Sequence, residues 1–150
     1  MEVILEIEKY ELGELGDVAR ELAGVLPEVG VLAVHGEMGV GKTTLVKELC
    51  RELGVVDEVS SPTFGLVNVY KAGERVINHV DLYRLKNAEE AETAGVFELF
   101  YSNALTIVEW PERIADELPL EMMLLKIDLC ENFNHDSCLL YTSPSPRDRG

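Results

Sequence analysis

One short stretch of this chain places glycines, a lysine and a threonine in an order that suits phosphate binding. Residues 36–43 read GEMGVGKT, which fits G-x-x-x-x-G-K-[ST] and lies between an apolar run and a helical pattern. The glycines allow turns that direct successive backbone N–H groups toward one anion, and the following helix adds its positive N-terminus. We expect Lys42 to contact the β- and γ-phosphates of a nucleotide and the Thr43 hydroxyl to bind Mg²⁺.

Two acidic residues follow apolar runs where an acid near the metal is expected. Asp81 ends RVINHVD, and Glu109 ends LTIVE. Because ligands bind at the carboxyl edge of an α/β sheet, both carboxylates should lie near the glycine loop. One would hold Mg²⁺, directly or through water, and the other would orient the attacking water. The residues alone do not decide which acid does which, and a solvated acid at a strand end is the simpler alternative for each.

Three further residues near these motifs have weaker signals. Thr63 lies in SSPTF, whose hydroxyls could sense a γ-phosphate as switch loops do, although Ser-Pro-Thr is also ordinary turn chemistry. Arg84 is a candidate phosphate or partner contact, although an exposed arginine is more often simply on the surface. His79 is expected to be packed within its strand, because no Ser or Cys nucleophile is arranged with it.

The elements that must position these residues alternate between strands and helices. Strands are expected at 3–8, 30–36, 104–110 and 124–129, with an antiparallel hairpin within 65–85. Helices are expected over 12–26 and 42–53, after an N-cap at Asn87, and over 111–118. The predicted class is α/β, a three-layer P-loop NTPase-like sheet with helices on both faces and an inserted antiparallel hairpin.

Composition limits the function classes. The chain of 150 residues has 13 basic and 28 acidic residues, so its formal charge is −15. Such a surface repels nucleic-acid phosphates, and a role connected with RNA would need another protein to hold the RNA. No apolar run reaches the length of a membrane span, and the start shows no secretory signal. The three cysteines have no paired or metal-ligand spacing, which fits the reducing cytoplasm.

The last residues differ in composition from the rest of the chain. Residues 138–150 read CLLYTSPSPRDRG, a polar segment rich in Ser and Pro. An ordinary disordered C-terminus is one interpretation. The segment also resembles the translation of a sequencing adapter, which we favour. We therefore divide the chain into an ATPase domain, residues 1–137, with a truncated C-terminal strand region, and a disordered adapter remnant, residues 138–150.

Four motifs together resemble one family. GEMGVGKTTL, SPTF, HVDLYRL and VEWPERI, in this order and spacing, are similar to the motifs of the TsaE family (formerly YjeE), the small bacterial P-loop ATPases of tRNA threonylcarbamoyladenosine biosynthesis. The resemblance covers about residues 3–129. It implies an ATPase that joins a TsaB–TsaD assembly, whose tRNA it meets only through these partners. Hydrolysis would reset that assembly between turnovers.

The resemblance also implies roles for individual residues. Thr43 and Glu109 would bind Mg²⁺, Asp81 would assist the metal or the water, and Trp110 would lie beside the nucleotide. The ATP-binding residues under this interpretation are Glu37, Met38, Gly39, Val40, Gly41, Lys42, Thr43, Thr44 and Trp110.

Rival functions share the phosphate-binding loop. A small-molecule kinase would need a lid with several arginines, which are sparse before residue 138. A GTPase would need an N-K-x-D base reader, which the sequence lacks. A nucleotide-gated scaffold with little turnover stays open on composition alone.

Overall fold

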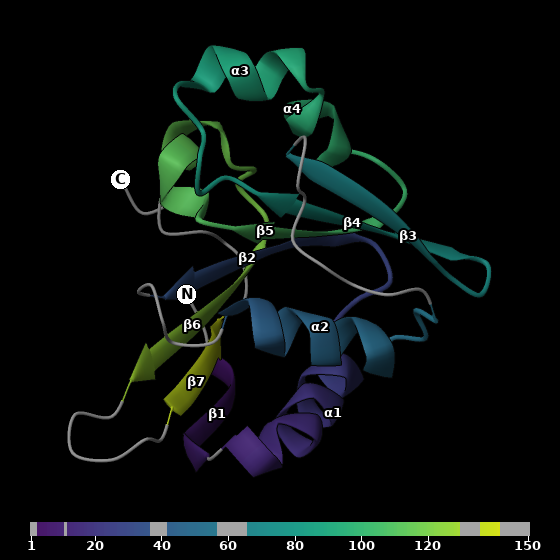
Figure 1. Cartoon of the computed structure of the whole chain (residues 1–150), viewed down its shortest axis with the longest axis vertical. Coiled ribbons are helices and arrows are strands. Elements are labelled where there is room, and N and C mark those ends of the chain that lie inside the picture. Colours follow the sequence, from purple (N-terminus) through teal and green to yellow (C-terminus); the bar gives the residue numbers. More distant parts are fainter. Residues whose placement is uncertain (1–2, 11, 37–41, 57–65, 130–135, 142–150) are drawn as a thin grey trace.

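The computed structural model describes residues 3–10, 12–36, 42–56, 66–129 and 136–141. Within these ranges, seven strands form one sheet in the order β1-β7-β6-β2-β5-β4-β3 (Figure 1). The strands are β1 (Val3–Tyr10), β2 (Gly30–Gly36), β3 (Val67–Ala72), β4 (Arg75–Asp81), β5 (Leu105–Glu109), β6 (Met123–Leu129) and β7 (Asp136–Tyr141). The central strands β6, β2, β5 and β4 are parallel, whereas the β3–β4 hairpin and the pairs around β7 are antiparallel.

Helices cover both faces of this sheet, which confirms the predicted three-layer α/β class (Figure 1). They are the α-helices α1 (Leu15–Val25), α2 (Lys42–Glu52), α3 (Ala88–Thr93) and α4 (Val96–Leu99) and the 3₁₀ helices η1 (Leu12–Glu14) and η2 (Pro111–Glu117). Helices α1 and α2 lie on one face, and α3 and α4 lie on the other. No helix in the described part of the chain combines the length and apolar character that a membrane span requires.

Strand alternation divides the core into two clusters, one on each face. In β2, Leu32 and Val34 join the cluster under α1 and α2, while Val31 and Ala33 join the cluster that includes α3, α4 and η2 residues. Both faces of β2 are therefore buried, as expected for a central parallel strand. Cys50 is a buried core residue, and burial raises the pKa of its thiol to about 12, with a smaller contribution from the charge of Glu109.

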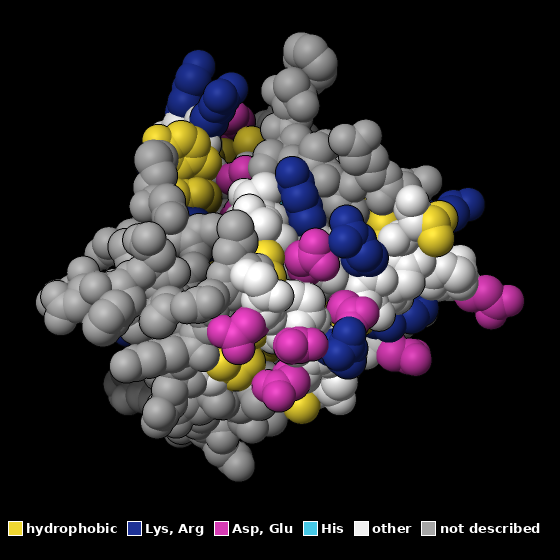
Figure 2. Space-filling view, turned by 60° about the horizontal axis from the view of Figure 1, so that its bottom comes forward, with side chains coloured by type: hydrophobic (Ala, Val, Ile, Leu, Met, Phe, Trp, Pro, Cys, Tyr) yellow, Lys and Arg dark blue, Asp and Glu magenta, His cyan; other side chains and the backbone are white. Residues whose placement is uncertain are grey.

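The outer surface of α1 and α2 carries both signs of charge. Arg20 pairs with Asp17 and Glu52, and Arg51 pairs with Glu48. Figure 2 shows acidic and basic side chains interspersed on this side of the molecule. These exposed pairs contribute little to stability, but they leave this face without a uniform charge.

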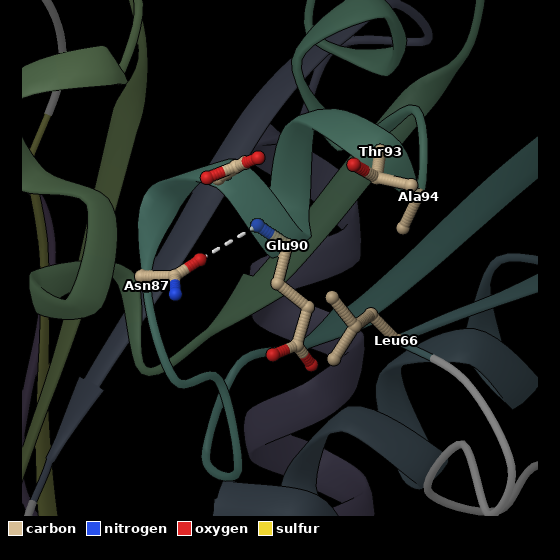
Figure 3. A pocket seen from close by; sticks show the side chains of 6 residues that line it. Leu66, Asn87, Glu90, Thr93 and Ala94 are labelled. Carbon is tan, nitrogen blue, oxygen red and sulfur yellow. Dashed lines mark hydrogen bonds between the residues drawn. The ribbon is translucent and has the colours of Figure 1, made fainter.

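The predicted N-cap at Asn87 is confirmed. Its side-chain oxygen accepts a hydrogen bond of 2.9 Å from the backbone N–H of Glu90 (Figure 3). The helical segment then breaks at Gly95, whose φ of 80° lies in the left-handed region that favours glycine. The segment thus forms two short helices, α3 and α4.

The predicted helix after Glu109 begins at Pro111, but it is a 3₁₀ helix. It contains a kink at Ile114 (φ −134°, ψ 41°). Ile114 is fully buried, so we attribute the kink to the packing of this side chain into the core.

The end of the chain corrects one expectation. Residues 136–141 form β7, which pairs with both β1 and β6. The prediction of disorder from Cys138 onward is therefore wrong for residues 138–141, and residues 142–150 lie outside the described part. The apolar run CLLY forms ladder hydrogen bonds with strands on both sides. These partners lie far away in the sequence, so the composition of the run alone does not indicate that it pairs.

Shortening the chain tests this strand. A chain ending at Ser137 should melt at least about 4 °C below the full chain, because β1 loses the strand that joins it to the sheet. A chain ending at Tyr141 serves as the control and should melt with the full chain. Equal thermal midpoints for all three chains, measured by calorimetry, would show that β7 contributes nothing.

Candidate functional site

The fold brings the sequence-predicted motifs to one edge of the sheet. Strand β2 ends at Gly36 and α2 begins at Lys42, so the described ends of the phosphate-binding sequence lie at the carboxyl ends of the parallel strands. Asp81 and Glu109 end neighbouring parallel strands and are directly opposite each other in the ladder. Both acids therefore end at the strand edge where α2 begins, and Glu109 contacts Thr43 of that helix. Glu37–Gly41 and Thr63 lie outside the described residues.

Lys42 is buried at the start of α2, and its ammonium group has two described contacts. Nζ donates a hydrogen bond of 2.6 Å to the carbonyl of Gly36 and lies 3.2 Å from the ring centroid of Trp110. Burial lowers the pKa of this lysine, while the negative charges of Glu112, Glu109 and Asp81 act in the opposite direction. The ammonium is thus held between a carbonyl oxygen and an indole face, an arrangement that favours a cation.

Glu109 connects three elements through its side chain. The Thr43 hydroxyl on α2 donates a hydrogen bond of 3.0 Å to Oε1, and His79 Nε2 on β4 lies 2.6 Å from Oε2. His79 is 0% exposed and Glu109 is 1% exposed. Because a buried carboxylate needs hydrogen-bond donors, these two contacts allow the acid to be buried here.

The donor set around Thr43 suits magnesium. A hydroxyl has one proton and two lone pairs, so the bond to Glu109 uses the proton and leaves the lone pairs for a cation. Mg²⁺ prefers oxygen ligands and takes only one or two from protein when phosphates and water supply the rest. Among the described residues, no group of three His, Cys, Asp or Glu side chains is arranged to hold a metal by itself.

Asp81 lies in a different environment from Glu109. Its Oδ1 accepts a hydrogen bond of 3.0 Å from the backbone N–H of Tyr83, and the side chain is half-buried. Burial raises the pKa of Asp81, the Tyr83 N–H opposes that shift, and the charge of Glu109 adds to it. Asp81 is therefore placed at the rim of the site, with a carboxylate that is easier to protonate than an ordinary aspartate.

Trp110 has an unusual backbone conformation. Its φ of 61° and ψ of 49° lie in the left-handed region, where a bulky residue is rare, and a helical backbone is disfavoured before Pro111. This turn places the indole over Lys42 and against Tyr83, with 5.1 Å between the ring centroids. Such strain persists only when its surroundings enforce it, and it concentrates at functional sites.

The remaining described candidates are exposed. Thr44 lies on the first turn of α2, and Arg84 lies in the turn after β4. His79 is buried, in agreement with the prediction that it packs within its strand, but the sequence does not predict its bond to Glu109. The two-residue spacing of His79 and Asp81 places both on the same face of β4, yet it does not give the strand register that brings His79 to Glu109.

A separate hollow of about 480 Å³ lies beside α3 (Figure 3). Its lining residues are Leu66, Asn87, Glu89, Glu90, Thr93 and Ala94. Among the described residues, none of the phosphate, metal or catalytic candidates lines it.

Comparisons with known proteins agree on one family. The family described as "Threonylcarbamoyl adenosine biosynthesis protein TsaE" matches residues 10–137. The tRNA threonylcarbamoyladenosine biosynthesis protein TsaE of Treponema pallidum is 35% identical over 112 residues, covering 75% of this chain and 82% of the relative. The protein of the same name from Aquifex aeolicus is 39% identical over 116 residues, covering 75% and 77%.

A solved structure agrees on the fold. The crystal structure of Bacillus subtilis YdiB matches with a TM-score of 0.71 and 23% sequence identity. The match covers 95% of this chain and 89% of that chain. At this identity the likeness concerns the arrangement of elements.

The Lys42 contacts generate a binding prediction. Lys42→Ala should lower affinity for a non-hydrolysable ATP analogue at least about tenfold, because a charge-assisted hydrogen bond contributes about 1.5–3 kcal/mol. Lys47→Ala removes an exposed lysine of the same helix and is the matched control. Calorimetric titration that finds equal affinity in both variants would exclude Lys42 as a phosphate ligand.

Proposed function

The chain belongs to the TsaE family, and on that premise we propose that it is the ATP-binding and ATP-hydrolysing subunit of the machinery that forms threonylcarbamoyladenosine in tRNA. The observation that carries this proposal is the hydrogen bond between Thr43 and Glu109. It joins the first turn of the helix after the phosphate-binding sequence to an acid at the end of a parallel strand. In P-loop NTPases, a hydroxyl at this position of the helix and an acid at the end of a neighbouring strand hold the Mg²⁺ that nucleotide cleavage uses, which supports the proposal.

The residues divide the work as follows in this proposal. Lys42, Thr44 and the backbone N–H groups of residues 37–41 hold the phosphates, and Trp110 lies beside the nucleotide. Thr43 and Glu109 would hold Mg²⁺, which when bound would supply Lewis-acid stabilisation of the charge on the phosphates. Asp81, at the rim, orients the attacking water or assists the metal through water.

The charge distribution supports a partner-dependent role. The segment 86–121, which contains α3, α4 and η2, has nine acidic residues and two basic ones. Of the nine, only Glu109 is buried, so this helical layer presents a negative surface. Such a surface suits docking against a basic assembly and disfavours direct contact with tRNA. We therefore propose TsaB and TsaD as partners in the cytoplasm, with tRNA held by them.

Partner stimulation follows from an incomplete site. Lys42, Thr43 and the two acids supply binding and the metal ligands. Arg84 is exposed in the turn after β4, so it is available to neutralise charge on the γ-phosphoryl group if a partner orders its side chain. Hydrolysis would then occur mainly in the assembly and would reset it between turnovers.

The contribution of the two acids to ATP turnover can be measured separately from their contribution to nucleotide binding. Glu109→Gln and Asp81→Asn should each lower ATP turnover in the assembly about 10²-fold, while nucleotide affinity changes less than about tenfold, because volume is kept and charge at the metal is removed. Phosphate release and analogue binding are measured on the same preparations. Glu98→Gln, on the exposed side of α4, is the control. Turnover at the wild-type rate in both acid variants would exclude both as metal-side acids.

Partner gating is tested by phosphate release from this chain alone and with TsaB–TsaD at two salt concentrations. We expect slow hydrolysis alone and at least about tenfold stimulation, since a supplied arginine can contribute 10³–10⁵-fold. Arg84→Ala should abolish the stimulation if this arginine acts in cis, whereas Arg51→Ala, an exposed arginine on α2, should not. Equal rates with and without partners would contradict the proposal, and binding without any hydrolysis would favour a nucleotide-gated scaffold. Transfer of phosphate to a small acceptor would favour a kinase.

A further inference from the structure

We propose that His79 is a positioning residue for the nucleotide site, acting through Glu109 on the Thr43 hydroxyl. This inference rests on the proposed function, because it concerns the metal and nucleotide that Thr43 and Glu109 would hold. His79 would touch neither of them. Its role would be to fix the orientation of a carboxylate that does.

The strand register explains why His79 reaches Glu109. Asp81 is directly opposite Glu109, and His79 is opposite Ile107 two residues earlier. Residues two apart point to the same face of a strand, so His79 lies diagonally from Glu109 on the face covered by α2. The distance of 2.6 Å between Nε2 and Oε2 is short, as in a hydrogen bond to a charged acceptor.

The direction of this hydrogen bond follows from the chemistry of the acceptor. An ionised carboxylate has no proton to donate, so the proton is assigned to Nε2 of His79. Nδ1 of the same ring is buried and has no hydrogen-bond partner among the described residues. Tyr70 packs near the ring, with 6.3 Å between the centroids. In the described structure, the polar contact of this imidazole is therefore directed to Glu109.

The consequence for the site depends on how the two oxygens of Glu109 are shared. His79 occupies Oε2, which leaves Oε1 for the Thr43 hydroxyl. Without the imidazole donor, Oε2 would be buried and unsatisfied, and the carboxylate would turn to share the Thr43 proton. The lone pairs of Thr43 would then lose their fixed direction toward a cation. Lys42, whose contacts are to Gly36 and Trp110, would keep its hold on phosphate.

Two substitutions separate this role from packing. His79→Phe keeps an aromatic ring and removes the donor, whereas His79→Gln places an amide N–H near the position of Nε2. Ile77→Val, on the same strand and face, is the control for a small loss of core packing. Affinity for a non-hydrolysable ATP analogue is measured with Mg²⁺ and with excess EDTA, together with the thermal midpoint of each variant.

We expect His79→Phe to lose about fivefold in affinity with Mg²⁺, within the loss expected for Glu109→Gln, and less than twofold in EDTA. His79→Gln should recover most of the Mg²⁺-dependent affinity, and Ile77→Val should change neither value. If His79→Phe does not fold, His79→Asn replaces it, because its amide is one methylene too short to reach Glu109. A purely structural role would lower both affinities together with the thermal midpoint, and that result would overturn the proposal.

Coupling to Glu109 gives a second readout. In a Glu109→Gln background, His79→Phe should cause less than twofold further loss, because the two side chains act as one unit. Additive losses would overturn the proposal. Wild-type protein that binds the analogue without any effect of Mg²⁺ would also overturn it. Failure of TsaB–TsaD to stimulate hydrolysis would contradict only the proposed function, since the binding measurements do not involve the partners.

Discussion

Burial of one carboxylate is the constraint on which the arrangement of this site depends. Glu109 sits in the interior, where an unsatisfied charge would be very costly, and its two oxygens meet donors from α2 and β4. The requirement can be met only if β4 lies beside β5 in the observed register and if α2 begins above this strand end. The contacts that allow the Glu109 carboxylate to be buried therefore also fix the position of Thr43, the residue that the loop sequence assigns to magnesium.

Lys42 shows the complementary problem of a buried cation. Burial lowers its pKa, whereas a carbonyl oxygen, an indole face and three nearby acids stabilise the charged ammonium. None of these neutralises the ammonium at contact distance in the described structure, as a phosphate oxygen would. The left-handed backbone of Trp110 contributes to this stabilisation, because it places the indole against the lysine between β5 and η2.

The sequence predicted the elements of this fold better than the contacts between them. Apolar runs ending in Asp81 and Glu109, and the glycine-lysine pattern, depend on local composition and spacing, as does the cap at Asn87. The bond from His79 to Glu109 depends on the register of two strands 30 residues apart, which no local pattern encodes. The conformation of Trp110 and the pairing of residues 138–141 likewise result from tertiary packing. This packing overrides the proline context of Trp110, and it pairs the apolar run CLLY although the segment 138–150 as a whole is rich in Ser and Pro.

The sheet also separates two helical layers of different charge, and this separation reaches the site. The α1–α2 layer carries mixed, mutually paired charges (Figure 2), whereas the segment with α3, α4 and η2 carries mostly acids. Glu112 of η2 belongs to the acidic layer, lies 3.4 Å from His35 Nδ1, and makes the largest charge contribution to the pKa of Lys42. In the proposed function, a basic partner covering η2 would weaken the field of Glu112 at the ammonium without touching the nucleotide. Docking and phosphate binding would then share this one charge.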